Sequence, residues 1–296
     1  MRISRKFSDT LAIPARIFST VHFIVIGAML FAIPAFAATF HEITVPGSQS
    51  TAANGINNSF QVVGFFEDSG GTHGFLLSQG TYQTLNFPGV TDFTVATGIN
   101  NTNEIVGYFF SSAEHGFINR GGDYKQIDFP SATSTLPQSV NNKGEIAGVY
   151  TDASGKTHGF KFANGTWSTL DAPGATSTSA QGINDAGNVA GFYNDATGQH
   201  GFDLTRDGRF RTINFPNAEA ASSATGINDN NQIVGQYLDP TLHKIQGFEF
   251  SNGQFNELQY PGASTTFPQG INNANFVVGS WFNSMGQQEG FLASPR

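Results

Sequence analysis

A short sequence, Gly-Ile-Asn, recurs at near-constant spacing along most of this 296-residue chain. Five copies keep the sequence and a sixth reads Ser-Val-Asn; the six begin at Gly55, Gly98, Ser139, Gly182, Gly226 and Gly270. The spacings between them are 43, 41, 43, 44 and 44 residues. Repeats of about 40–45 residues with four strands each are typical of β-propeller blades. The spacing therefore predicts an all-β repeat protein.

Residues 94–130 show one unit clearly, with strands predicted over 94–100 and 104–110, from 115, and over 124–129. Gly121-Gly122 forms the last hairpin, and other units place Gln79-Gly80, Asn164-Gly165, Asp207-Gly208 and Asn252-Gly253 there. Such pairs favour two-residue hairpins because both central residues can adopt positive φ. A proline ends each fourth strand, where a missing N–H costs no ladder bond: Pro46, Pro88, Pro130, Pro173, Pro216 and Pro261.

The two ends of the repeat region complete each other. The last unit stops after its third strand, and residues 40–47 resemble a fourth strand with its proline. We therefore predict a six-bladed β-propeller of four-stranded blades, closed when the strand at 40–45 pairs with the one at 290–293. The small residues of the first strand should crowd the axis. The alternative is an open solenoid, which would need polar capping repeats that the sequence does not show.

Residues 1–37 have the pattern of a bacterial Sec-type signal peptide. A basic start precedes an apolar run over 23–32, and Ala35-Phe36-Ala37 is a small-x-small cleavage site. The run is shorter than the ~20 residues that a membrane span needs, which disfavours an uncleaved anchor. We expect cleavage after Ala37, a domain over 38–296 without a membrane anchor, and secretion or periplasmic export.

Charge and composition exclude several partners. The predicted leader holds four basic residues and Asp9, so the mature chain keeps 10 basic and 21 acidic residues, a net charge of −11. Nucleic acid and anionic lipid both require a basic face and are not expected as partners. The sequence has no cysteine, which excludes disulfides, thiolate metal sites and a cysteine nucleophile. We predict a monomer without cofactor or metal.

The repeat resembles a known family. His-Gly-Phe opens the third strand at His73, His115, His158 and His200, downstream of Gly-Ile-Asn-x-x-Gly-x-(Ile/Val)-(Val/Ala)-Gly. Together these motifs resemble the HAF-repeat family of extracellular bacterial proteins, with Gly in place of Ala. The last two copies depart from it, with Gln246 and Glu289 in place of His. The resemblance covers nearly all of residues 40–296 and implies export and a β-repeat fold, but no biochemical activity.

The repeated polar residues have a structural interpretation. A metal ring would need the histidines within about 2 Å of one ion, whereas equivalent positions on different blades lie far apart. We expect each histidine to bond a backbone group of its own blade. Asp152 and Asp195 begin Asp-x-x-Gly sequences that fit type I turns. Calcium remains an alternative there, although no segment matches an EF-hand loop.

The sequence suggests a binding surface but no catalytic motif. One aromatic residue lies two positions after each second-strand glycine: Phe66, Phe109, Tyr150, Tyr193, Tyr237 and Trp281. With the loop acids and Glu289, these could form a rim that binds a glycan or protein; the alternative is packing between blades. We expect a non-catalytic binding or scaffold propeller. A hydrolase or lyase with a site spread over several blade loops, and a purely structural surface protein, are the alternatives.

Overall fold

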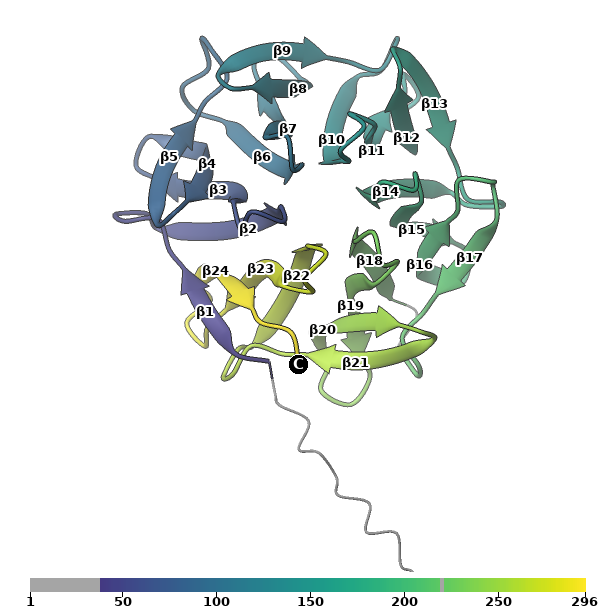
Figure 1. Cartoon of the computed structure of the whole chain (residues 1–296). Coiled ribbons are helices and arrows are strands. Elements are labelled where there is room, and N and C mark those ends of the chain that lie inside the picture. The colour runs from purple at the N-terminus through teal and green to yellow at the C-terminus, as the bar shows by residue number, and fades with distance from the viewer. Residues whose placement is uncertain (1–37, 219–220) are drawn as a thin grey trace, which may run out of the picture. The chain divides into compact units, whose positions relative to one another are not determined.

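A computed structural model describes residues 38–218 and 221–296, so the predicted signal peptide lies outside the described residues. These ranges form six antiparallel sheets of four strands, and no helix within them is long and apolar enough to cross a membrane. The sheets surround a central axis (Figure 1). The predicted six-bladed β-propeller is confirmed.

The blades follow the chain in order. Blade one holds β2 (Ser50–Ile56), β3 (Val62–Asp68), β4 (Gly71–Ser78) and β5 (Thr81–Leu85), and blade two holds β6 (Thr94–Ile99), β7 (Glu104–Phe110), β8 (Glu114–Arg120) and β9 (Asp123–Ile127). Blade three holds β10 (Ser134–Val140), β11 (Ile146–Thr151), β12 (Thr157–Ala163) and β13 (Thr166–Leu170), and blade four holds β14 (Ser177–Ile183), β15 (Val189–Asp195), β16 (Gly198–Leu204) and β17 (Phe210–Ile213). Blade five holds β18 (Ser222–Ile227), β19 (Ile233–Asp239), β20 (Lys244–Ser251) and β21 (Gln254–Leu258). Blade six holds β22 (Thr265–Ile271), β23 (Val277–Phe282), β24 (Gln288–Ala293) and, from the start of the domain, β1 (Phe40–Ile43).

The ring closes as the sequence predicts. β1 pairs antiparallel with β24, with Phe40 opposite Ala293 and Ile43 opposite Gly290. Phe40 also packs edge-on against Tyr260 and Phe291. Blade six is thus built from both ends of the domain. Because β1 pairs with β24, β24 does not present an unpaired edge.

A repeated phenylalanine forms the core of each blade. Phe75, Phe117, Phe160, Phe202, Phe248 and Phe291 are all at most 1% exposed. Each faces a glycine on the second strand, and the pair Gly64–Phe75 shows why. A Cβ on Gly64 would lie 1.9 Å from the Ala52 carbonyl oxygen and 2.9 Å from the Phe75 ring. Only glycine leaves room for the ring at this position.

Asparagines join the blades in a closed circle. The Nδ2 of each Gly-Ile-Asn asparagine donates to the backbone carbonyl of the equivalent asparagine in the next blade, through Asn57, Asn100, Asn141, Asn184, Asn228, Asn272 and back to Asn57. The residue after each asparagine forms a second closed circle, with its side-chain oxygen accepting from the previous blade's backbone N–H: Asn58, Asn101, Asn142, Asp185, Asp229 and Asn273. We call these the asparagine rings.

Candidate functional site: the axial cavity

A cavity of about 250 Å³ lies among the first strands of the blades, and all six blades contribute to its lining. Six polar residues, one from each blade, form a ring around it: Asn54, Thr97, Gln138, Gln181, Thr225 and Gln269. Each stands at the irregularity in the pairing of first and second strands, for instance between Ala53 and Gly55. Such β-bulges re-aim a side chain that regular pairing would place elsewhere. The six bulges thus form a polar ring at the axis.

Members of this polar ring differ in their hydrogen bonds. Thr97 donates to the Pro137 carbonyl at 2.7 Å, and Thr225 donates to the Pro268 carbonyl at 2.7 Å. Asn54 Nδ2 donates to the Ala96 carbonyl at 2.9 Å. These three side chains therefore join blade one to two, blade two to three, and blade five to six.

The side chains of the three glutamines make no hydrogen bond to a neighbouring blade within the described residues. Gln181 Nε2 donates to Ser179 Oγ at 2.6 Å, within its own blade. The side chains of Gln138 and Gln269 make no hydrogen bond within the described part of the chain. They belong to blades three and six, whose inner strands β10 and β22 lie on opposite sides of the axis (Figure 1). The cavity thus has two uncommitted carboxamides on opposite walls.

Aromatic side chains line another part of the cavity. Phe65 and Tyr108 follow the second-strand glycines of blades one and two, and Val95 lies beside them. Burial and the nearby Glu114 carboxylate raise the pKa of Tyr108 to about 12. Its hydroxyl therefore stays protonated at neutral pH. This wall combines apolar surface with one hydroxyl group.

A smaller cavity of about 80 Å³ lies next to the axial one, and both asparagine rings line it. Asp185 and Asp229 contribute its two carboxylates, and both accept hydrogen bonds from neighbouring blades. Asn142 Nδ2, for example, donates to Asp185 Oδ2 at 2.7 Å. The asparagine rings therefore occupy the end of the axis formed by the turns between first and second strands.

Within the described ranges, no group of three or more His, Asp or Glu side chains is placed to hold a metal ion. The lining of the axial cavity itself has no carboxylate, imidazole, ammonium or guanidinium group. Its chemistry is that of neutral amides, hydroxyls and apolar rings.

The structure places most of the predicted aromatic rim between blades. Phe66, Phe109, Tyr150 and Tyr237 are each at most 8% exposed. Three stack face to face on the aromatic residue that precedes the proline of the preceding blade, in the pairs Phe87–Phe109, Phe129–Tyr150 and Phe215–Tyr237, with ring centroids 3.7–3.8 Å apart. These covered faces are not available to a ligand.

The two remaining members of this set are half-buried. Trp281 stacks on Tyr260 at 4.1 Å, whereas Tyr193 has Ala172 at the position of the stacking ring and packs edge-on against Phe210. A role in ligand binding stays a prediction for Tyr193 and Trp281. The signal in the sequence was the aromatic residue that precedes four of the six prolines and stacks on the second-strand ring of the next blade: Phe87, Phe129, Phe215 and Tyr260.

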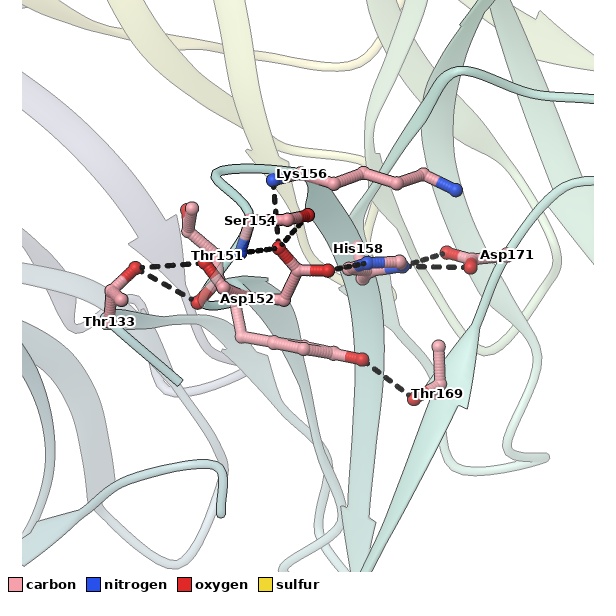
Figure 2. A network of polar contacts seen from close by, with 9 residues as sticks. Thr133, Thr151, Asp152, Ser154, Lys156, His158, Thr169 and Asp171 are labelled. Carbon is pink, nitrogen blue, oxygen red and sulfur yellow. Dashed lines mark hydrogen bonds and ion pairs between the residues drawn. The ribbon is translucent and has the colours of Figure 1, made fainter. Parts of the chain in front are cut away.

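The repeat histidines bond side chains, which corrects the expectation of backbone partners. Figure 2 shows His158 between Asp152 and Asp171, with Nδ1 at 2.8 Å from Asp171 Oδ2 and Nε2 at 3.3 Å from Asp152 Oδ2. The imidazole also stacks on Tyr150, with ring centroids 5.0 Å apart. Equivalent contacts join the other histidines to the residue after the fourth strand, in the pairs His73–Asn86, His115–Asp128 and His200–Asn214. Each histidine thus links the third strand of its blade to the residue that follows the fourth strand.

The loop aspartates organise their turns. Asp152 Oδ1 accepts from the Ser154 hydroxyl and from the backbone N–H groups of Ser154 and Lys156 (Figure 2). These hydrogen bonds hold the pKa of Asp152 well below its usual range. Asp195 accepts similar bonds from Thr197, and its pKa is also lowered. Both carboxylates therefore accept hydrogen bonds from residues of their own loop.

Blade six replaces the histidine by Glu289. Its Oε2 accepts a hydrogen bond from the Thr44 hydroxyl at 3.0 Å, and Thr44 stands where blades one to four place Asn or Asp after the fourth strand. Burial is the main cause that raises the pKa of Glu289. Glu289 therefore lies at the junction of the two ends of the domain, and it does not line the axial cavity.

No protein-family model and no curated protein matches the sequence. Among solved structures, the protein is similar to TolB from Acinetobacter baumannii, with a TM-score of 0.58 and 10% identity over 85% of this chain and 66% of that chain. It is similar to a mutant of the Aleuria aurantia lectin in complex with alpha-methyl-L-fucoside, with a TM-score of 0.53 and 12% identity over 85% and 93% of the chains. It is also similar to a streptogramin B lyase, with a TM-score of 0.52 and 13% identity over 86% and 97%. These likenesses show the fold alone.

Proposed function

We propose that the protein is an exported, non-catalytic binding propeller that takes part of an extracellular glycan or protein into its axial cavity. The observation that carries this proposal is the lining of the cavity, which combines uncommitted amides with apolar rings and no ionised group. The lining is mostly polar, so a ligand would be held chiefly by hydrogen bonds to convergent polar groups, with the apolar rings beside them.

The same lining argues against the hydrolase or lyase alternative at this site. General acid–base catalysis requires a titratable group within hydrogen-bond reach of the proton that moves, with a pKa near the working pH. The titratable side chain of the lining is Tyr108, whose pKa of about 12 leaves it protonated. The repeat histidines and aspartates are bonded within their own blades.

A cavity-filling variant tests the proposal. Gln181→Trp would place a bulky ring in the axial cavity, and Gln83→Trp on the exposed outer strand β5 is the matched control. Both proteins are compared with the parent on a glycan array and a peptide array, after their folding has been checked by circular dichroism. We expect binding by the parent and the control but not by Gln181→Trp. Binding that survives in Gln181→Trp would overturn the axial site.

A hydrolase and lyase panel run beside the arrays tests the non-catalytic part of the proposal. Turnover by the parent that Gln181→Trp abolishes would place catalysis in the cavity and contradict our assignment. Absence of both binding and turnover would favour the purely structural alternative.

Export is part of the same proposal and rests on the leader pattern of residues 1–37. Intact-mass analysis of the exported protein should give a chain that begins at Ala38. A mass that includes residues 1–37 would contradict cleavage. The likeness to HAF-repeat proteins supports export without adding an activity.

A further inference from the structure

We propose that the axial cavity receives the terminal, uncharged pyranose of a glycan, and that Gln138 and Gln269 clamp this sugar from opposite walls. The inference rests on the proposed function, and it names the ligand class and the residues that would recognise it. Three observations carry it: the order of residues in the polar ring, the charge around the entrance, and the size of the cavity.

The polar ring repeats after half a turn. Its residues in chain order are Asn, Thr, Gln, Gln, Thr and Gln. The sequence of an amide side chain, a threonine and a glutamine therefore occurs twice around the ring. Both threonines are bonded to the following blade's proline carbonyl, as described above. The following glutamines, Gln138 and Gln269, come directly after these prolines and have no bond of their own within the described residues. Six similar blades thus leave two equivalent free carboxamides half a turn apart.

This arrangement fits a sugar ring. A carboxamide offers two N–H donors and one carbonyl acceptor, whereas each sugar hydroxyl can both donate and accept. Equatorial hydroxyls radiate from opposite edges of a pyranose, so amides on opposite walls can bind both edges at once. The C–H face of the ring is apolar and would lie against the aromatic wall of Phe65 and Tyr108. Free amides left without a partner in the complex would weaken binding, which makes the pairing selective.

Charge at the entrance favours a neutral sugar. The loops between second and third strands surround the end of the axis opposite the asparagine rings. These loops and the adjoining strand ends carry six acidic residues, Glu67, Asp68, Glu114, Asp152, Asp195 and Asp239, against two lysines, Lys156 and Lys244. A negative potential at an entrance disfavours anionic ligands. Uronic and sialic acids are therefore expected to bind more weakly than neutral hexoses.

Cavity size favours a terminal residue. Sites for drug-sized ligands occupy about 300–1,000 Å³, and this cavity of about 250 Å³ lies below that range. The adjoining cavity inside the asparagine rings is smaller still, at about 80 Å³. One sugar residue can enter, and the rest of the glycan would remain outside, at the loops between second and third strands.

The test measures binding of small probes to the purified domain over 38–296. The probes are methyl glycosides of glucose, galactose, mannose, fucose and N-acetylglucosamine, together with glucuronic acid, N-acetylneuraminic acid and capped neutral tripeptides. Saturation-transfer NMR identifies binders, and calorimetry gives Kd. The variants are Gln138→Ala, Gln269→Ala and their double, with Gln83→Ala and Gln254→Ala on the exposed fourth strands as matched controls.

We expect at least one neutral glycoside to bind and the two acids not to bind. Each clamp variant should raise Kd about tenfold, the loss expected for one or two hydrogen bonds, and the controls should leave it unchanged. Binding of a glycoside that the double variant retains would overturn the clamp. Stronger binding of the acids, or no binding by any glycoside, would overturn the ligand class. A capped peptide that binds and is lost in Gln181→Trp would overturn this inference while leaving the proposed function intact.

Discussion

The Thr44 hydroxyl lies 3.0 Å from Glu289 Oε2, and this contact joins the residue that follows the first strand, β1, to the last strand, β24. In blades one to four the equivalent contact pairs a histidine with Asn or Asp. In blade six, Glu replaces His and forms one of the contacts that close the ring. It explains a departure from the repeat that the sequence alone left open between a structural and a binding role.

Glu289→Gln should be as stable as the parent near pH 4 and more stable above pH 6. The folded protein raises the pKa of Glu289, chiefly by burial. Its favourable contribution is therefore present at low pH and is lost as the pH rises through the raised pKa. Glutamine resembles the protonated form and keeps an acceptor for Thr44. Thermal unfolding at pH 4 and pH 7.5 should show a gain in Tm of about 1–3 °C at the higher pH alone. Exposed Glu67→Gln is the control, and a loss of Tm in Glu289→Gln at pH 7.5 would refute this account.

Ile43→Ala should weaken ring closure. Ile43 is 5% exposed, pairs with Gly290 and belongs to the core between blades six and one. Loss of a buried isoleucine typically costs about 2–5 kcal/mol of unfolding free energy. His41→Ala, on the exposed face of the same strand, should cost much less. Urea unfolding of both variants checks the prediction.

Deletion of residues 38–46 removes the whole strand that closes the ring. The deletion variant should lose more stability than Ile43→Ala and should aggregate through the exposed strand edges. Equal stability of the deletion variant and the parent would contradict a closed ring.

Asn184→Ala should destabilise the protein although it removes no apolar contact. Asn184 is 3% exposed, donates to the Asn228 carbonyl and accepts from the backbone N–H of Asn188. Each buried group left without a partner costs about 1–3 kcal/mol. Exposed Asn256→Ala, on β21, is the matched control. Urea unfolding should show a lower midpoint for Asn184→Ala. If both variants unfold at the same midpoint, the asparagine ring contributes nothing to stability.

The hydrogen bonds of Asp152 predict an acid-sensitive loop. Because the folded protein holds the pKa of Asp152 below its usual range, the stabilisation is present above pH 4 and is lost as the pH falls through the lowered pKa. Asp152→Asn should therefore be less stable than the parent at pH 6, and the difference should shrink toward pH 2. Thermal unfolding across this range measures it. A difference that grows as the pH falls would show that the sign is wrong.

Much of the fold could be predicted from residue types because each blade repeats the same local requirements. Hairpin glycines, strand-ending prolines and a third-strand phenylalanine mark the four strands wherever they recur. The pairing of residues 40–43 with 290–293 also followed, since an orphan fourth strand and a three-stranded unit complete each other. The polar contacts were harder to assign. The histidines proved to bond side chains, and four of the six residues in the aromatic set proved to stack on an aromatic residue that precedes a proline.

The sequence by itself therefore determined the number of blades, their strand order and the way the ring closes, because these depend on local patterns and on their count. Tertiary structure alone decided where a binding site could lie. Gln138 and Gln269 are 131 positions apart in the chain, and the proline that precedes each of them sets blades three and six apart from the other blades but does not show that the two side chains face each other. A bulge turns each one toward the axis, and the ring then sets their blades half a turn apart. Such a site exists only when six bulges meet around one axis, since the geometry arises from closure and not from any single repeat.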